Sequence, residues 1–235
     1  MKLTVLGCSN TWTTRFTSCY LINDNILMDC GADAYKAYIQ TGKSLNDIKL
    51  FLITHFHADH IFGLNVFLTN IHRRFESIGF KATIVGPKGI KEACENVFKY
   101  STQIEFDFKD RINFIEIQDG QTIILDNIKI TGYKLDHDDV VDFGYILNDG
   151  GKTLGYTGDT TDCDEFRSFL SKSDVCIMNI SRPKTNSKHL GVDTFEQLLS
   201  ANNGKTLLAT HCDEEVYNLP IIKENRVEEG QVYNI

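Results

Sequence analysis

Residues 54–60, with the sequence THFHADH, place four metal-binding side chains within six positions, directly after an apolar run. His55 and His57 are two residues apart, so both side chains project to the same side of an extended segment. Asp59 and His60 follow where the chain can turn into a helix and direct them at the same point. Imidazole and carboxylate ligands suit zinc, manganese or iron. Four such groups exceed what one open catalytic zinc needs, so the segment predicts two adjacent metal ions.

Three further ligand-type residues follow other apolar segments: His137, Asp159 in the sequence GDT, and His211 in the sequence TH. Asp159 and His211 repeat the pattern of 51–55, in which an apolar strand and a threonine or glycine precede a ligand, and His137 closes a β-rich run after Leu135 and Asp136. A strand that carries a ligand at its end holds that ligand rigidly. Taken singly, each could be a surface or hydrogen-bonded residue, and the first cluster could be a polar loop. The chain has only seven histidines, so their clustering favours one shared metal site.

The predicted elements alternate along the chain without a linker, which predicts a single domain over residues 1–235. Strands are expected at 2–7, 20–22, 25–28, 48–53, 82–85, 112–117, 122–135, 143–157, 175–178 and 206–209. Helices are expected near 34–38, 61–71, 90–98, 162–171 and 193–201, and turns at 23–24 and 149–151. The second half repeats the order of the first, with several strands followed by strand–helix units. Two facing sheets with helices outside would bury this pattern.

Composition excludes several classes of protein. Hydrophobic residues make up 42% and charged residues 24% of the 235 residues, as in soluble globular proteins. No apolar run reaches the ~18 residues that a membrane span needs, and the N-terminus does not resemble a signal peptide. The seven cysteines include no C-x-x-C pair. They are therefore expected to be free thiols in a reducing cytoplasm.

The net charge of −8 disfavours long nucleic acid as a partner. Two divalent cations would leave the chain acidic, and proteins that hold long RNA or DNA normally present a basic surface. A local basic patch at 72–74 is the exception. The charge instead favours a small anionic substrate held mainly by metals.

The motif H-x-H-x-D-H, followed by a histidine, GDT and TH, resembles the metallo-β-lactamase superfamily over essentially the whole chain. The resemblance implies an α/β fold, the αββα sandwich of two mixed sheets, and a dinuclear site between the sheets. It implies one metal on His55, His57 and His137, a second on Asp59, His60 and His211, and Asp159 as the bridge between them. Zinc is the expected metal, with manganese as the alternative. Asp29 matches the acid that supports the ligand loop, and family members are commonly homodimers.

The 22 positions from His137 to Asp159 resemble the ribonuclease Z and cyclic-phosphodiesterase branch of that superfamily. Members that process tRNA insert a long tRNA-gripping arm there, for which this chain has no room. The short form resembles the cyclic phosphodiesterase of the carbon–phosphorus lyase pathway. It also resembles phage anti-Pycsar enzymes that destroy cyclic nucleotides. The resemblance therefore implies hydrolysis of a 3′,5′-cyclic nucleotide or a related cyclic phosphodiester.

Two residues are expected to move protons. Asp59 could accept the proton of the attacking water. His189 resembles the extra histidine of this branch, which protonates the leaving group; its alternative is a solvent-exposed loop residue. Members that process tRNA carry a glutamate where this chain reads MNIS at 178–181, so the acid that would orient His189 is missing.

Other functions and one loop stay open. A thioester or lactone hydrolase resembling glyoxalase II could use the same ligands, and a ribonuclease Z-like RNA phosphodiesterase is a further alternative. A non-catalytic metal-binding module is disfavoured because all seven ligand-type residues are present. Trp12, Arg15 and Phe16 lie in an early loop that could overhang the site, where an exposed Trp–Arg pair suits base stacking. It could instead reach a partner subunit, and burial of Trp12 is the remaining alternative.

Overall fold

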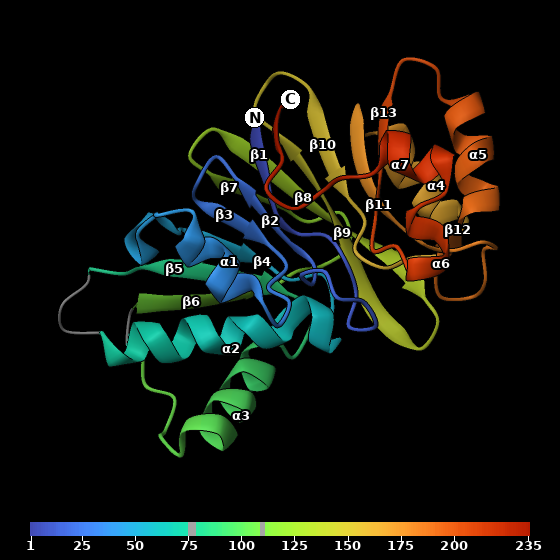
Figure 1. Ribbon diagram of the computed structural model, residues 1–235. Helices are drawn as coiled ribbons and strands as arrows, with labels where there is room; N and C mark the ends of the chain where they lie inside the picture. Colours follow the sequence, from blue (N-terminus) through green and yellow to red (C-terminus); the bar gives the residue numbers. More distant parts are fainter. Residues whose placement is uncertain (75–78, 109–110) are drawn as a thin grey trace.

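The computed structural model describes residues 1–74, 79–108 and 111–235, which form two seven-stranded β-sheets with helices on their outer faces (Figure 1). The first sheet has the order β14 (Val232–Asn234), β1 (Lys2–Gly7), β2 (Cys19–Ile22), β3 (Ile26–Met28), β4 (Leu50–Leu52), β5 (Ala82–Gly86) and β6 (Ile112–Glu116). The second has the order β12 (Leu190–Gly191), β11 (Val175–Arg182), β10 (Thr153–Tyr156), β9 (Val140–Asn148), β8 (Ile128–His137) and β7 (Thr122–Leu125), with β13 (Thr206–Thr210) paired to β11.

Both sheets are mixed, as predicted. In the first sheet β14, β1, β2 and β3 pair antiparallel, whereas β3 to β6 pair parallel. In the second sheet β7 to β10 pair antiparallel, whereas β11 pairs parallel with β10, β12 and β13. Parallel neighbours need crossover connections. Helices α1 (Ala34–Gln40), α2 (Ala58–Arg73) and α3 (Ile90–Thr102) lie in them in the first half, and α4 (Asp164–Ser171) and α5 (Val192–Ala201) in the second.

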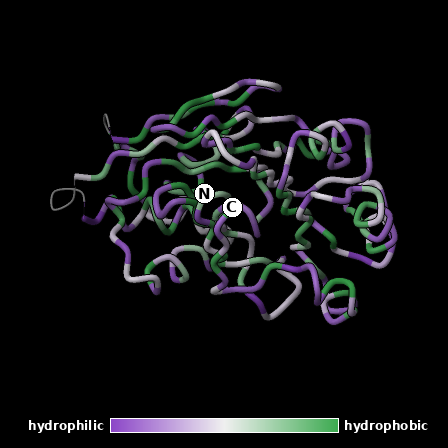
Figure 2. The backbone as a smooth tube through the Cα atoms, turned by 90° about the horizontal axis from the view of Figure 1, so that it is seen from above, coloured by the Kyte–Doolittle hydropathy of each residue, from purple (hydrophilic) through white to green (hydrophobic). Residues whose placement is uncertain are grey.

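The hydrophobic core lies in three layers, as an αββα sandwich requires. Alternation along β2 shows why: Tyr20 and Ile22 pack between the two sheets, whereas Leu21 packs toward the helices. The cluster around Leu21 includes buried residues of α1 (Ala34–Gln40), α2 and α3, and a third cluster joins the second sheet to α4 and α5. Hydrophobic residues recur along the central strands in Figure 2. This layering confirms the predicted fold class.

Most expected elements are present at the expected places. Helix α2 forms because Leu64, Phe67, Leu68 and Ile71 fall on one face and are all buried. The turns at 23–24 and 149–151 join antiparallel strands as predicted. The sequence did not predict β12, β14, the 3₁₀ helix η1 (Leu45–Asp47), α6 (Glu214–Tyr217) or α7 (Pro220–Asn225). All seven cysteines are free thiols, and no helix in the described ranges has the length and apolar character to cross a bilayer.

Candidate metal centre

Seven histidine and aspartate side chains meet at one edge of the sandwich, where several strands end. His55 follows β4, His137 is the last residue of β8, Asp159 follows β10, and His211 follows β13. Asp59 and His60 lie in the first turn of α2, whose N-cap is the extended residue His57. The predicted change from an extended segment to a helix is therefore present, and it brings both parts of the motif to the same point.

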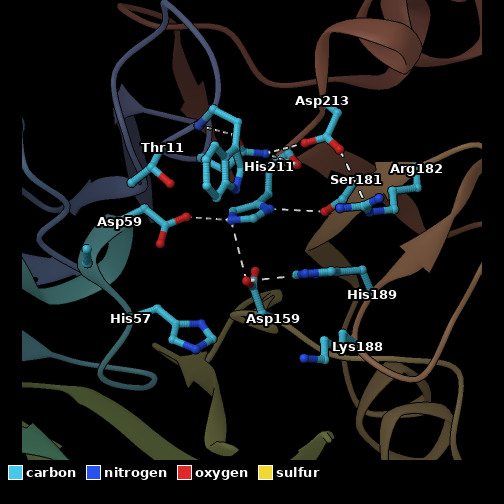
Figure 3. Close-up of a pocket in the computed structure, with 13 residues that line it drawn as sticks. Thr11, His57, Asp59, Asp159, Ser181, Arg182, Lys188, His189, His211 and Asp213 are labelled. Atoms are coloured by element: carbon cyan, nitrogen blue, oxygen red, sulfur yellow. Dashed lines mark hydrogen bonds and ion pairs between the residues drawn. The ribbon is translucent and has the colours of Figure 1, made fainter.

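The ligand-type atoms form two adjacent groups, and a third group, Asp159, His189 and His211, overlaps both of them. His55, His57, His137 and Asp159 form the first group, and Asp59, His60 and His211 the second; within each, the atoms lie within 4.8 Å of one another. Asp159 Oδ2 lies 4.0 Å from Nε2 of both His55 and His137, 3.6 Å from Nε2 of His60 and 3.4 Å from Nε2 of His211. The carboxylate of Asp159 thus faces both groups, as Figure 3 shows for His211.

Three buried atoms at this point fit a bound cation. Nε2 of His55, Nε2 of His60 and Oδ1 of Asp159 have no hydrogen-bond partner among the described residues. Unpartnered buried polar atoms are uncommon, because losing water without a replacement costs free energy. Divalent cations between the two groups would satisfy all three atoms. The residues present therefore fit a dinuclear centre.

Four of the histidines are held through Nδ1, which leaves Nε2 directed into the site. His60 Nδ1 lies 2.6 Å from Asp29 Oδ2, and His55 Nδ1 lies 2.9 Å from Asp142 Oδ1. The partners of His137 and His211 are the carbonyl oxygen of Lys188 at 2.8 Å and Oγ of Ser181 at 3.0 Å. Such outer partners fix the ring orientation of metal-binding histidines.

The backbone near the site adopts conformations that few residues tolerate. Asp29 and His211 have φ values of 54° and 58° without being glycine, and strained residues of this kind cluster at functional sites. Gly158 has a φ of 62°, and a Cβ atom there would lie 2.6 Å from Asp142 Oδ1 and 2.7 Å from Thr54 Cβ. Only glycine lets the Asp159 loop approach this closely.

Charges in the cluster shift the pKa values of Asp59, His60 and His211. Burial alone would raise the pKa of Asp59, but hydrogen bonding to His211 and the nearby His60 hold it at about 2. Burial would lower the pKa of His60, yet the carboxylates of Asp159 and Asp29 raise it well above its usual value. The pKa of His211 is raised by Asp159 and Asp59 against the effect of burial. The metal-free cluster thus holds protons where cations would bind.

Metal affinity is therefore expected to rise with pH. Because the pKa values of His60 and His211 are raised in the metal-free fold, protons compete with the metal for these two rings up to a higher pH than they would for a free imidazole, and they must leave before Nε2 can coordinate. Each released proton changes affinity up to about tenfold per pH unit while the folded-state pKa exceeds the pH. We expect zinc to bind at least about tenfold more weakly near pH 6 than near pH 8. Chelator competition measures this, and a pH-independent affinity with no proton release would contradict it.

A cavity of about 410 Å³ opens over the cluster. It is lined by Asn10, Thr11, Trp12, His57, Ala58, Asp59, Asp159, Ser181, Arg182, Lys188, His189, His211 and Asp213. His189 is not a solvent-exposed loop residue, because its side chain is 17% exposed and Nδ1 lies 3.8 Å from Asp159 Oδ2. Of the predicted site residues, His57, Asp59, Asp159, His189 and His211 line this cavity, whereas His55, His60 and His137 lie in the same cluster but outside the lining.

Asn179 lies in the segment 178–181, which lacks the acid that would orient His189, and its amide contacts that histidine instead. Its Oδ1 accepts the backbone N–H of Thr160 at 3.0 Å, which turns Nδ2 toward Nδ1 of His189 at 3.2 Å. The amide therefore donates to Nδ1, and the proton of the neutral ring lies on Nε2. Sequence reasoning missed Asn179 and Asp142 as partners of site histidines. The only signal for Asp142 is a charged residue within the apolar strand β9.

The chain is similar to known proteins in its sequence and in its fold. A family model described as "Anti-Pycsar protein Apyc1" matches residues 1–228. Ribonuclease Z of Macrococcus caseolyticus is 32% identical over 156 residues, which cover 63% of this chain and 49% of that protein. The chain thus spans about half the length of the curated relatives that it matches.

Two solved structures share the fold over almost the full length. The metallo-β-lactamase fold protein YhfI from Bacillus subtilis has a TM-score of 0.81 and 21% identity, with coverage of 99% of this chain and 98% of that one. A diphosphatase from the PhnP family has a TM-score of 0.76 and 18% identity, with coverage of 100% and 97%. The αββα fold implied by the motifs is therefore confirmed.

Proposed function

Because the chain belongs to the anti-Pycsar protein Apyc1 family, in the ribonuclease Z-like branch of the metallo-β-lactamase superfamily, we propose that it is a dinuclear-metal phosphodiesterase. Its proposed substrate is a small cyclic nucleotide of the 3′,5′ type or a related cyclic phosphate. The observation that carries the proposal is the position of Asp159, whose Oδ2 lies within 4.0 Å of imidazole nitrogens from both ligand groups. One carboxylate can bridge two cations only from such a position.

The proposed ligand sets follow the two groups. His55, His57 and His137 would hold one metal, Asp59, His60 and His211 would hold the other, and Asp159 would contribute to both. We expect zinc, with manganese as the alternative, because imidazole and carboxylate donors suit both. Two such ions would supply a water that is nucleophilic near neutral pH and would neutralise charge on the phosphoryl group.

The protein's own groups then orient the substrate and move protons. Asp59 is ionised at neutral pH because its pKa is about 2, and its carboxylate can accept a proton from the attacking water. Burial lowers the pKa of His189 to about 4, so its ring is neutral at pH 7. With Nδ1 held by Asn179, the neutral ring can donate a hydrogen bond from Nε2–H that stabilises the charge on the departing oxygen, without giving up its proton.

Removing this donor should slow turnover without removing metal. His189→Ala is expected to lower kcat by about 10²- to 10³-fold, the usual contribution of a positioned hydrogen-bond donor to a developing negative charge, while the metal content per chain stays unchanged. The neighbouring Lys188→Ala, whose side chain is 59% exposed and pairs with Asp138 at 3.4 Å, is the matched control. Loss of metal in His189→Ala would instead make His189 a ligand or a structural residue.

The size of the cavity and the short connection between His137 and Asp159 support a small substrate. A cavity of about 410 Å³ lies in the range of small-molecule sites. Between His137 and Asp159, β9 and β10 and their short turns occupy the chain, which leaves no segment for an arm that grips tRNA. A long RNA substrate is therefore the less favoured alternative.

A substrate panel tests the proposal directly. The metal-loaded protein is incubated with 3′,5′- and 2′,3′-cyclic mononucleotides, and ring opening is followed by chromatography, with Asp159→Ala as the control. Cleavage that disappears in the control supports the proposal, and the product isomer identifies the leaving oxygen. Activity only on ribosyl cyclic phosphates would move the substrate to the phosphonate-pathway class. Activity only on thioesters or lactones would overturn the phosphodiesterase assignment.

We also propose that the chain forms a homodimer, through α2 and α3. Phe62 and Val66 of α2 and Val97 and Tyr100 of α3 are 54%, 39%, 39% and 80% exposed, and an apolar groove of about 180 Å³ lies between these helices. Exposed apolar patches of this kind mark interaction sites. Light scattering should give twice the chain mass of 26.7 kDa, and Phe62→Glu should shift it to the monomer. A wild-type monomer at micromolar concentration would reject the dimer.

A further inference from the structure

Trp12 is the only tryptophan of the chain, and its side chain is 85% exposed at the rim of the metal cavity. Indole is among the largest apolar groups that a protein can bury. The cavity below it carries ligand-type and charged groups on its other walls. A large flat ring is thus placed next to a polar, metal-binding floor.

The loop that carries Trp12 is firmly held although its tip is exposed. Asn10 Oδ1 accepts the backbone N–H of Trp12 at 3.0 Å, while Asn10 Nδ2 donates to Asp213 Oδ1 at 2.7 Å and to the carbonyl of His211 at 3.4 Å. Arg15 lies on the far side of the tip. Asn10 thereby joins the backbone at Trp12 to the segment that carries a proposed ligand.

Arg15 makes the second attachment. Its guanidinium pairs with Glu214 at 2.9 Å, donates to the carbonyl of Cys212 at 2.8 Å and lies 3.6 Å from the ring centre of Tyr217. Both ends of the loop tip are thus tied to residues 211–217. Trp12 and Arg15, which were predicted to stack on a base as a pair, therefore have different roles. Arg15 anchors the loop, and the exposed ring of Trp12 is available to a ligand.

We infer that Trp12 is a stacking platform for the nucleobase of the substrate, an inference that rests on the proposed phosphodiesterase function. The backbone of its loop is anchored before binding, so little loop entropy is lost on stacking. Bases of every kind stack on an aromatic ring, because each has a π-face. Asp213 and Arg182, which lie 3.9 Å apart (Oδ2 to Nε) and border the same cavity (Figure 3), offer an acceptor and donors to the base edge.

Because Trp12 is the only tryptophan, its fluorescence reports on this subsite alone. The metal-loaded protein is titrated with guanosine 5′-monophosphate, adenosine 5′-monophosphate and the base-free ribose 5-phosphate, with excitation where tyrosine does not absorb. We expect saturable quenching by both nucleotides and little change with ribose 5-phosphate. Equal responses to all three, or none to the nucleotides, would overturn the platform.

Kinetics give the second readout. Trp12→Ala should raise the KM for 3′,5′-cyclic GMP about tenfold or more, with a smaller effect on kcat. Trp12→Phe, which keeps an aromatic ring, should have a KM close to that of the wild type. Thr14→Ala, on the exposed side of the same loop, is the matched control. An unchanged KM, or an equal loss on a base-free cyclic ribose phosphate, would contradict the inference.

The two readouts separate failure of the inference from failure of the proposed function. Hydrolysis of cyclic nucleotides without a fluorescence response leaves the phosphodiesterase and rejects the platform. Nucleotide quenching in a protein that hydrolyses no cyclic phosphate keeps the platform and rejects the reaction.

Discussion

Asp159→Ala is expected to abolish the proposed dinuclear centre and to lower kcat/KM by about a thousandfold or more. The carboxylate is the only group whose oxygen approaches nitrogens of both ligand groups among the described residues, at 3.4 to 4.0 Å. Bound metal ions stabilise transition-state charge by several kcal/mol, and about 1.4 kcal/mol corresponds to a tenfold change in rate. Metal analysis of the purified variant should show fewer ions per chain than in the wild type.

Thermal unfolding provides an activity-independent check of the same prediction. Ligands that bind only the folded state stabilise it, so chelation should lower the Tm of the wild-type protein. The Tm of Asp159→Ala should respond much less, because it has less metal to lose. Asp139→Ala, an exposed acid in the turn between β8 and β9, is the matched control and should behave as wild type. An Asp159→Ala protein with full metal content would show that other residues bridge the ions.

The sequence predicted those parts of the site that depend on local order. An apolar strand, a threonine and then H-x-H-x-D-H specify an extended segment that turns into a helix, and the structure has this geometry at His55 to His60. The strand-end residues Asp159 and His211 could be predicted because the same local pattern recurs, and His137 because it closes a β-rich run. Their grouping followed from the resemblance, since contacts between distant strands are not encoded in any one segment.

The unpredicted parts depend on tertiary contacts. Alternation along β9 gives no reason to bury Asp142, yet the fold places it 2.9 Å from His55 with no exposed surface. Asn179 acts on His189 only because β11 and the following loop bring them together. The short edge strands β12 and β14 form by pairing with longer neighbours rather than from their own composition. The exposure of Trp12 depends in the same way on anchors far along the chain.

Asp29→Ala is expected to have the largest effect on stability, a loss of about 3–5 kcal/mol in the free energy of unfolding. The fully buried carboxylate accepts four hydrogen bonds: from Thr54 N at 2.8 Å, Thr54 Oγ1 at 3.0 Å, His60 Nδ1 at 2.6 Å and Tyr156 Oη at 2.7 Å. Alanine would leave all four donors without their acceptor. It would also place a residue that disfavours positive φ at a backbone φ of 54°.

Asp29→Asn separates the role of the carboxylate in folding from its role at the metal site. Asparagine tolerates the positive φ and keeps an oxygen for the N–H of Thr54, so denaturant unfolding should show a smaller loss than for alanine. Its NH₂ group cannot accept from His60 Nδ1, which frees the ring to change tautomer and orientation. Metal affinity should therefore fall about 10- to 100-fold, as for other outer partners of metal-binding histidines. Unchanged affinity in a stable Asp29→Asn protein would mean that Asp29 supports the fold alone and that the packing of α2 suffices to direct His60 into the site.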